Sequence, residues 1–341
     1  MTKTYDVLGA GIAAVDDLLY VADYPVANAK IPVAGIARRG GGPACTAIAA
    51  VGALGGRAAY VARLGSNEWS TYIKSALQRR GVDTARVIFD AEAGPYHSVI
   101  IVDNFGNRNV FYDPSLYHGV EAEDLPDSVI QSTALFLLDH LTEPGLLKVA
   151  ERVHGLGVPI LGDLEGRSES AMRLAELTDY LVVPEEFAAW AAGTTAPRSA
   201  CASLAHVRRL ATVVTAGAEG CYFSTDIDHA VVHVPAFQVD AQNTNGCGDT
   251  FHGAFALAVA RNLAVKDAVV FASAAAALKA AAPAQGGQGW DTLPALDSVL
   301  SFLRLRLAEP DRSLLLDKLD LLGPVPREVP ERRCGSEALL T

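Results

Sequence analysis

Short apolar runs of β type alternate along the chain with stretches in which apolar residues recur at helical spacing. The apolar runs cover residues 5–11, 58–65, 134–139, 158–163, 180–184 and 211–217. Helical spacing occurs at 44–54, 67–80, 145–156, 168–178 and 199–210. Repeated strand–helix–strand alternation is typical of a mostly parallel sheet with helices on both faces. Such sheets bind ligands at the carboxyl ends of their strands, so candidate site residues are expected there.

One segment departs from this alternation. Residues 97–114, HSVIIVDNFGNRNVFYDP, hold two strand-like arms joined by turn residues from Asn104 to Asn107, which predicts a β-hairpin. With the extended piece at 18–38, this hairpin would form a small flap on the main sheet, although an ordinary edge hairpin fits the same pattern. Residues 310–341, which include a tail rich in Pro and Arg, are expected to be an appendage with a frayed end.

Composition narrows the class of protein. The chain has 341 residues, with 28 Lys and Arg against 39 Asp and Glu, and no dense basic run, so we expect no nucleic-acid partner. Five cysteines without CxxC spacing indicate neither a disulfide framework nor a zinc site. No signal-peptide pattern opens the chain, and the most apolar helical stretch, 267–283, is interrupted by Lys279. These features predict a soluble, cytoplasmic protein without a membrane partner.

Several familiar motifs are weak or missing. Residues 9–14, GAGIAA, look like a dinucleotide fingerprint, but the chain lacks the acidic residue that a Rossmann site needs about 20 residues further on. The sequence contains no GxxxxGK[ST], no HExxH and no GxSxG. A dehydrogenase, a P-loop nucleotide site, a catalytic zinc site and a Ser-His-Asp hydrolase are therefore disfavoured.

The stretch NTNGCGDTFHG at 243–253 precedes a run that reads as a buried helix. One interpretation is structural: a Gly-rich turn ends in Asp249 or Thr250, which caps the helix. The other is functional: the backbone amides of Gly246, Cys247 and Gly248 bind a phosphoryl group at the helix N-terminus, and Asp249 is a general base. The residues of this stretch alone leave both interpretations open.

Two further loops follow predicted strands. TAGAEG at 215–220 is a small glycine-bearing loop that a nucleotide could approach closely. GDLEGR at 162–167 places Asp163 and Glu165 where acids can hold Mg²⁺ through water, and Arg167 where it can reach phosphate. An ordinary turn and a solvated loop explain the same two patterns.

Taken together in this order, the motifs resemble the ribokinase-like PfkB family of carbohydrate kinases over about residues 5–305. NTNGCGDTFHGAFA resembles the family's second signature, and GGGPACTAIAAVGALGG at 40–56 its first. TAGAEG resembles the family's T-x-G-x-x-G nucleotide loop, and the segment at 163–167 its D-x-N-x-R motif. Agreement at four ordered sites is much harder to obtain by chance than any single motif.

The resemblance implies a three-layer α/β/α core with a mostly parallel central sheet and a small β-sheet lid. The kinase domain would span residues 1–309, with lid segments at about 13–38 and 96–116, and residues 310–341 would form a C-terminal extension. The resemblance also implies ATP and Mg²⁺ as cofactors, with K⁺ near the 272–282 and 284–289 segments in many members. A homodimer formed through the lid is a further expectation.

Residue roles follow from the matching positions. The catalytic set would be Asp249 as general base with Gly246, Cys247 and Gly248 as the anion hole. The substrate-binding candidates are Asp16, Gly41, Gly42, Cys45, Arg108, Asn109 and His140. The candidates for binding the nucleotide are Thr215, Gly217, Gly220, Asn243, Thr244, Arg167, Ala282 and Gly286. Glu186 and Asp163 are the candidates for handling the metal.

The chain departs from the family pattern at several of these positions. Asn243 and Cys247 replace the usual Asp and Ala of the second signature, and Glu165 replaces the Asn of D-x-N-x-R. Cys45 stands where the first signature commonly has an Asn that binds sugar hydroxyls, and a thiol is a poor substitute for an amide. We therefore expect that the substrate is not held as ribose is, and that the nearest branch is that of sulfofructose and fructose kinases.

The predicted function is an ATP-dependent sugar kinase that phosphorylates a hydroxyl of a small keto-sugar or furanose. One alternative is a nucleoside kinase of the same fold, in which Phe105, Phe111 and Tyr112 would line a base pocket. A second alternative is a sugar- or nucleotide-binding regulator that has lost turnover.

Overall fold

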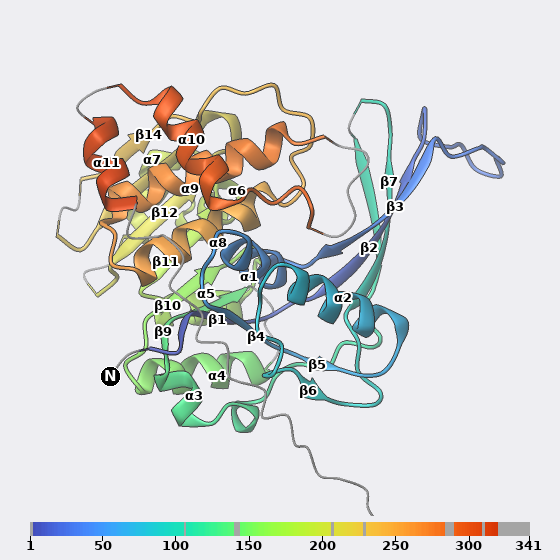
Figure 1. Cartoon of the computed structure of the whole chain (residues 1–341), viewed down its shortest axis with the longest axis horizontal. Helices are drawn as coiled ribbons and strands as arrows, with labels where there is room; N and C mark the ends of the chain where they lie inside the picture. Colours follow the sequence, from blue (N-terminus) through green and yellow to red (C-terminus); the bar gives the residue numbers. More distant parts are fainter. Residues whose placement is uncertain are drawn as a thin grey trace, which may run out of the picture.

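The computed structural model describes residues 3–105, 107–139, 144–205, 208–227, 230–283, 290–308 and 311–319. Within them, eight strands form a central sheet in the order β14-β13-β12-β11-β10-β9-β1-β4 (Figure 1). Their bounds are β1 Tyr5–Ala10, β4 Ala58–Val61, β9 Thr133–Asp139, β10 Ile160–Asp163, β11 Tyr180–Pro184, β12 Ala211–Thr215, β13 Cys221–Thr225 and β14 Val232–Val234. Neighbours from β4 to β12 pair in parallel, and β13 and β14 are antiparallel additions at one edge.

Helices cover both faces of this sheet, as successive residues of β1 show. Val7 belongs to one core cluster and Leu8 to the other, because neighbouring side chains in a strand point to opposite faces. The cluster that contains Val7 includes buried residues of six helices: α1 Pro43–Ala53, α2 Glu68–Arg79, α8 Cys247–Ala260, α9 Val265–Ala281, α10 Leu296–Arg306 and α11 Asp311–Leu319. The cluster that contains Leu8 includes buried residues of α3 Asp127–Gln131, α4 Pro144–Gly155, α5 Glu169–Leu177, α6 Glu185–Ala192 and α7 Pro197–Leu204. Both buried faces explain why the parallel strands read as continuous apolar runs.

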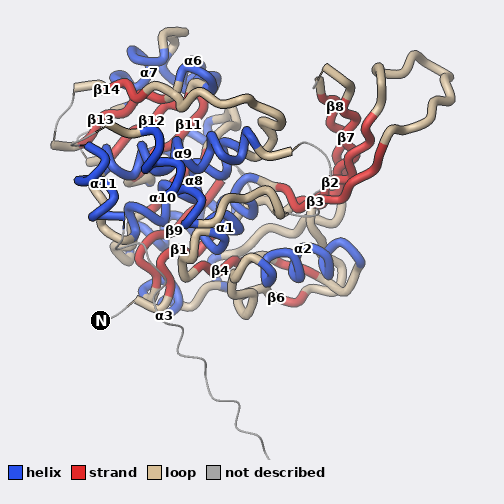
Figure 2. The backbone as a smooth tube through the Cα atoms, turned by 45° about the horizontal axis from the view of Figure 1, so that its top comes forward, coloured by secondary structure: helices blue, strands red, loops and turns tan. Residues whose placement is uncertain are grey.

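A second, smaller sheet stands away from the core, as Figure 2 shows. Its four strands have the order β3 Gly35–Gly41, β2 Ala14–Tyr20, β7 Tyr96–Val102 and β8 Arg108–Asp113. The predicted hairpin is confirmed, since β7 and β8 pair antiparallel from His97 opposite Asp113 to Val102 opposite Arg108. The extended piece that precedes the hairpin in the sequence supplies β2 and β3, and β2 pairs with β7. The interpretation as a flap is therefore confirmed, and that as an ordinary edge hairpin is wrong. We call this four-stranded sheet the lid.

Two sequence-based boundaries are wrong. The apolar run 58–65 divides into β4 and a short strand, β5 Arg63–Leu64, which pairs with β6 Ile88–Phe89 outside the central sheet. The helical pattern 199–210 ends early, because α7 stops at Leu204 and Ala205 is extended. The Arg209 guanidinium donates to the carbonyl oxygens of Leu204 and Ala175, near the ends of α7 and α5. These carbonyls also accept from the hydroxyls of Thr212 and Thr178, so side chains satisfy both helix ends.

The described chain packs onto the core beyond residue 309. Leu315 and Leu319 of α11 are buried in the cluster that contains Val7. Residues 309, 310 and 320–341 lie outside the described residues. Among the helices that the structure describes, none combines the length and apolar character required to cross a membrane.

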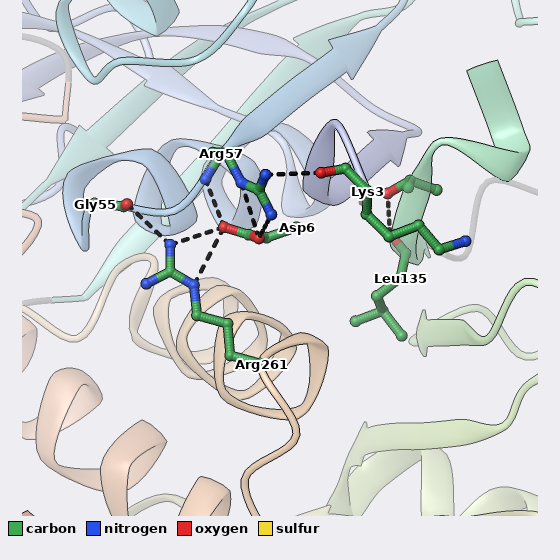
Figure 3. Close-up of polar contacts among 7 residues, drawn as sticks. Lys3, Asp6, Gly55, Arg57, Leu135 and Arg261 are labelled. Carbon is green, nitrogen blue, oxygen red and sulfur yellow. Dashed lines mark hydrogen bonds and ion pairs between the residues drawn. The ribbon is translucent and has the colours of Figure 1, made fainter. Parts of the chain in front are cut away.

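An ion triad fixes the amino-terminal end of β1, at the opposite end of the strand from the candidate site (Figure 3). The buried Asp6 carboxylate accepts hydrogen bonds from Arg57 Nη2 at 2.6 Å and from Arg261 Nη2 at 2.8 Å. Burial favours the neutral acid, but the bonds from Arg57 and Arg261 outweigh it and hold the pKa of Asp6 below its usual value. Arg57 directly precedes β4 and Arg261 is the C-cap residue of α8, so the triad joins β1 to the neighbouring strand and to the end of α8.

Candidate active site

The Gly-rich turn at 243–246 leads directly into the N-terminus of α8. Gly246 is the N-cap residue with φ 74°, a left-handed conformation that glycine adopts without strain, and no side chain caps the helix. Asp249 lies in the first turn and Thr250 Oγ1 donates to the carbonyl of Gly246 at 2.6 Å, so the helix-capping interpretation of Asp249 or Thr250 is wrong. The first amides of a helix have no partner within the helix, and they attract negative charge. Of the three amides predicted to bind a phosphoryl group, that of Cys247 donates to the carbonyl oxygen of Thr244 at 3.3 Å.

The Asp249 carboxyl shares a poorly hydrated region with Asp163, at the carboxyl end of β10. Burial, followed by the nearby charge of Asp163, raises the pKa of Asp249 well above its usual value. His252, one turn along α8, works in the opposite direction. Burial and the neighbouring acids Glu165 and Asp139 likewise raise the pKa of Asp163. Two carboxyl groups placed so close together do not both ionise easily, which is common where a site is built to handle protons.

His252 lies beside Asp163, between α8 and the end of β11. Its Nδ1 lies 2.8 Å from Gly248 O and its Nε2 lies 2.9 Å from Val182 O. Nε2 is also 3.3 Å from Asp163 Oδ1, yet neither oxygen of Asp163 has a hydrogen-bond partner among the described residues. An Nε2–H that points at the nearer carbonyl oxygen of Val182 does not point at Asp163 Oδ1, which is why Asp163 lies close to the ring without a hydrogen bond from it. Asp163 is therefore a buried carboxyl group at the end of β10 whose hydrogen-bonding capacity the described residues leave unused.

A pocket of about 490 Å³, partly open to solvent, joins Asp249 to the base of the lid. Its lining includes Asp16, Arg39 and the Gly40–Gly42 segment from the lid, Thr46 of α1, Asn245 and Gly246 from the turn, Lys279 of α9, and Trp290. Trp290 Nε1 donates to Thr46 Oγ1 at 3.0 Å. The pocket thus combines hydrogen-bonding groups, both charges and one aromatic wall, the surface that a small polyhydroxylated ligand needs.

Two glycines are required by the crowding of this pocket. A Cβ atom on Gly41 would lie 2.2 Å from Asp16 Oδ2, so the glycine leaves room for that carboxylate. A Cβ atom on Gly42 would lie 2.2 Å from the carbonyl oxygen of Ile12, and Gly42 has φ 86°. Side chains at either position would displace the lid strands or the start of α1 from the pocket.

Asp16 lies at the floor of the pocket and is 9% exposed. Burial raises the pKa of Asp16 to about 6, although a hydrogen bond with Ser98 and the charges of His97 and Arg39 favour the ionised form. A carboxyl group with a raised pKa stabilises the fold fully only at low pH, and that contribution is lost as the pH rises through the folded-state value. The buried Asp16 therefore lowers the stability of the fold at neutral pH, which is expected of a group that serves ligand binding.

Replacing Asp16 by Asn should stabilise the protein near neutral pH. From the pKa of about 6, we expect Asp16→Asn to raise the free energy of unfolding by up to about 3 kcal/mol at pH 8, a gain that disappears towards pH 4. Asp17→Asn is the matched control. Its pKa is lowered, chiefly by the hydrogen bond from Arg38, so the same change should destabilise the protein at neutral pH. Urea unfolding at several pH values measures both, and a loss of stability in Asp16→Asn at pH 8 would contradict this account of Asp16.

The predicted nucleotide loop lies at the carboxyl end of β12. Thr215 is the last residue of that strand, and Gly217 and Gly220 have φ 51° and 101° in the turn to β13. A Cβ atom on Gly220 would lie 2.1 Å from Val234 O, so the loop can close only with glycine there. Ala216 N donates to Gly220 O at 2.8 Å. Ala282 is the C-cap of α9, the helix that packs on α8.

A second hollow, of about 1180 Å³ with open solvent included, separates the lid from the segment before α8. Arg108 of β8 lines it with Asn243, Thr244 and Asn245. Arg108 Nη1 donates to Asn245 Oδ1 at 2.9 Å, across the hollow from the lid to the core. The lid therefore already contacts the turn that leads to the N-terminus of α8.

Several other residues predicted to belong to the site lie away from the first pocket. Cys45 is fully buried in α1, where burial raises its pKa well above the usual value, and it does not line the first pocket. Asn109 is exposed on β8, Arg167 is exposed beyond β10, and Glu186 is exposed in the first turn of α6. His140 and Gly286 lie outside the described residues, as does the 284–289 segment on which the K⁺ expectation partly rests.

The donor groups fit a Mg²⁺ ion carried mainly by phosphates. Among the described residues, no three His, Cys, Asp or Glu side chains gather into a metal-binding group, and Asp163 is buried whereas Glu186 is exposed. Mg²⁺ commonly keeps its waters and is bound through one or two carboxylates together with substrate phosphates. The unpartnered oxygens of Asp163 and the exposed Glu186 suit that mode and not a cage of protein ligands.

Sequence reasoning missed the pocket residues Arg39, Thr46, Lys279 and Trp290. Lys279 carried a signal, since it is the single charged residue between positions 268 and 283 of an Ala-rich apolar stretch. Trp290 carried none, because its contact with Thr46 spans 244 positions of the chain.

Residues 10–288 match the family described as pfkB family carbohydrate kinase. The chain is 30% identical over 234 residues to probable fructokinase-3 of Arabidopsis thaliana, a match that covers 63% of this chain and 67% of that protein. It is 29% identical over 235 residues to fructokinase-1 of Zea mays, which covers 63% of this chain and 72% of that protein.

Solved structures show the same architecture. A putative ribokinase from Agrobacterium tumefaciens superposes with a TM-score of 0.76 at 30% identity, covering 89% of this chain and 98% of that one. Ribokinase of Arabidopsis thaliana, solved with ribose and ATP, superposes with a TM-score of 0.77 at 21% identity, covering 90% and 100%. The predicted ribokinase-like fold, with a mostly parallel central sheet and a small separate sheet, is confirmed.

Proposed function

Because the chain belongs to the pfkB family of carbohydrate kinases, and is therefore a phosphotransferase, we propose that it transfers the γ-phosphoryl group of MgATP to a hydroxyl of a small keto-sugar or furanose. One observation carries this proposal: Asp249 and the start of α8 line the same pocket as Asp16 and the Gly40–Gly42 segment. A base, an anion-binding turn and a hydroxyl-binding carboxylate thus meet in one small space.

In the proposed reaction, Asp16 accepts hydrogen bonds from sugar hydroxyls and holds the acceptor hydroxyl towards Asp249. The Asp249 carboxylate takes the proton of that hydroxyl as the sugar oxygen bonds to the γ-phosphorus. The bond from phosphorus to the β,γ-bridging oxygen breaks, and its electron pair leaves with ADP. Positioning and electrostatic stabilisation supply most of the rate, because the loose transition state of phosphoryl transfer needs little covalent help.

The anion-binding turn stabilises the transferred group through the amides at the start of α8, of which the Gly248 amide is the leading candidate. Thr215, Gly217 and Gly220 would contact the nucleotide at the end of β12, with Asn243, Thr244, Arg167 and Ala282 beside it. Asp163 and Glu186 would hold Mg²⁺ through water, and the ion would neutralise phosphate charge when bound. The lid supplies Asp16 and the Gly40–Gly42 segment, so its closure would complete the pocket and exclude water.

Fructokinases among the relatives favour a fructose-type sugar as the substrate. The nucleoside-kinase alternative receives less support, because Phe111 and Tyr112 are exposed on β8 and line neither hollow. Phe105 borders the second hollow but is 80% exposed. The regulator alternative is disfavoured by the ordered base and turn at the pocket.

We also propose that two copies pair through their lids. The exposed apolar side chains Ile36, Val110, Phe111 and Tyr112 all lie on the two edge strands of the lid, β3 and β8, and exposed apolar surface favours association. Sedimentation velocity should show a dimer for the wild-type protein and a monomer for Phe111→Asp. A monomeric wild-type protein at micromolar concentration would remove this proposal and leave the kinase assignment intact.

The function is tested by measuring ADP release from MgATP against fructose, sulfofructose, fructose phosphates, ribose, 2-keto-3-deoxygluconate and adenosine. We expect ADP release that depends on a sugar. Phosphorylation of adenosine alone would support the nucleoside-kinase alternative. Bound ATP with no release across the panel would favour the regulator.

A further inference from the structure

Lys279 is a buried cation that the proposed reaction does not yet use. It lies in the last turn of α9 and is 5% exposed. Its ammonium donates to the carbonyl oxygen of Asn245 at 2.7 Å, on the residue that precedes Gly246. Burying a lysine is costly unless its charge is compensated, and within the described part of the chain this carbonyl oxygen is the acceptor found for its three N–H donors.

The position of this ammonium is next to the anion-binding turn. Lys279 lines the same pocket as Gly246 and Asp249. A Cβ atom built on Gly246 would lie 3.8 Å from Lys279 Cε, so the lysine side chain borders the first residue of the turn. No ion pair joins Lys279 to a carboxylate within 4.0 Å among the residues that the structure describes.

The charges around Lys279 do not neutralise it fully. Burial lowers the pKa of Lys279, and the positive charges of Arg39 from β3 and Arg108 from β8 act in the same direction. The Cys247 thiol and the Asp249 carboxyl, both on α8, act against them. An incoming anion would stabilise an ammonium held between two other cations.

Resting on the proposed kinase function, we propose that the Lys279 ammonium contacts the phosphoryl group in transfer, as a fixed cation opposite the amides of the α8 turn. It neutralises charge that spreads over the equatorial oxygens of that group, and it neither gives nor takes a proton. The proton of the sugar hydroxyl still passes to Asp249, and the bond to the leaving ADP oxygen still breaks with its electron pair on ADP. Lys279 thereby supplies from α9 the cationic help that P-loop enzymes obtain from a lysine in the loop itself.

A purely structural role is the alternative, in which Lys279 only holds the Asn245 carbonyl and so orients the turn. The two roles differ in what they require of the side chain. A structural role needs an N–H donor, whereas contact with a phosphoryl group in transfer needs positive charge. Lys279→Gln keeps a donor without charge, Lys279→Arg keeps the charge, and Lys279→Met keeps neither.

The experiment compares the full-length wild-type protein with these three variants, using the most active sugar of the panel. We measure kcat, the KM for the sugar, the Kd for MgADP and the midpoint of thermal unfolding. Lys279→Gln and Lys279→Met should each lose about tenfold to a hundredfold in kcat, because each lacks the charge. Their Kd for MgADP should stay within about threefold of the wild-type value, because ADP has no γ-phosphoryl group. Lys279→Arg should retain more activity than either.

The pH profile separates charge from hydrogen bonding. A neutral lysine amine still donates N–H bonds but no longer carries charge, so wild-type kcat should fall as the pH rises through the lowered pKa of Lys279. This alkaline limb should be absent or shifted to higher pH in Lys279→Arg, which retains the Cys247 thiol and all other neighbours. An unchanged limb in Lys279→Arg would assign the titration to another group and overturn the charge role.

The possible outcomes distinguish this inference from the proposed function. An active wild-type protein whose Lys279→Gln variant is equally active overturns the role of Lys279 and leaves the kinase intact. Loss of MgADP binding and of thermal stability in Lys279→Gln, in proportion to its loss of kcat, overturns the role in favour of the structural one. A wild-type protein without sugar-dependent ADP release overturns the proposed function, and this role with it.

Discussion

Replacement of Asp249 by Asn should lower kcat by 10² or more, up to about 10⁴, while the protein stays folded. An amide cannot accept the proton of the sugar hydroxyl, but it has nearly the same size as the carboxyl and can occupy the same place in the first turn of α8. The variant also removes the repulsion between Asp249 and Asp163, so its stability at neutral pH should equal or exceed that of the wild type. Steady-state kinetics and urea unfolding of the same preparation measure both effects.

The wild-type pH profile provides a second readout of the same group. The raised pKa of Asp249 places the acid limb of kcat/KM above the range of an ordinary carboxyl, because the base works only when ionised. Asp163→Asn should move that limb to lower pH by removing the adjacent charge. Asp267→Asn, on α9 outside the described pocket linings, is the matched control and should leave kcat unchanged. Retention of full activity by Asp249→Asn would rule out Asp249 as the base.

Replacement of Asp6 by Ala should lower the free energy of unfolding by about 3 kcal/mol or more, since truncating one partner of a buried ion pair commonly costs 3–5 kcal/mol. The loss leaves Arg261 buried without its carboxylate, whereas Arg57 is one-third exposed and can partly recover its bonds from water. Asp6 is at the amino end of β1, so kcat of the folded protein should not change. Urea unfolding and activity at low temperature measure the two effects separately.

Glu151→Gln is the control for this experiment, because it breaks an exposed ion pair with Arg173. Exposed pairs contribute little, so the free energy of unfolding should change by less than about 1 kcal/mol. A similar loss in Glu151→Gln and Asp6→Ala would contradict the special position of the Asp6 triad in the fold.

The parallel core could be predicted from the sequence because its strands are buried on both faces and read as continuous apolar runs. The lid could also be predicted, since its hairpin shows paired arms and turn residues without a helix. The division of residues 58–65 could not, because the pairing of β5 with β6 depends on segments about 25 residues apart and leaves no local mark.

Part of the candidate site could also be predicted from the sequence. The turn at 246–248 and Asp249 stand together in the sequence, so their chemistry could be inferred from one stretch. Arg39 and Lys279 reach the same pocket from a strand and a helix far apart in the sequence, and neither segment shows by itself which space its charge borders. Only the fold shows that they border one space with Asp16 and Asp249.

In the proposed function, this pocket passes a phosphoryl group from ATP to a sugar. The most direct measurement is to incubate the wild-type protein with MgATP and fructose, and then to identify the products by phosphorus NMR and mass spectrometry, with Asp249→Asn beside it. We expect ADP and a sugar phosphate in equal amounts, formed by the wild type and greatly reduced in the variant. Equal sugar phosphate formation by Asp249→Asn, or ADP and free phosphate without any phosphorylated sugar from this or the other panel sugars, would contradict the proposed function.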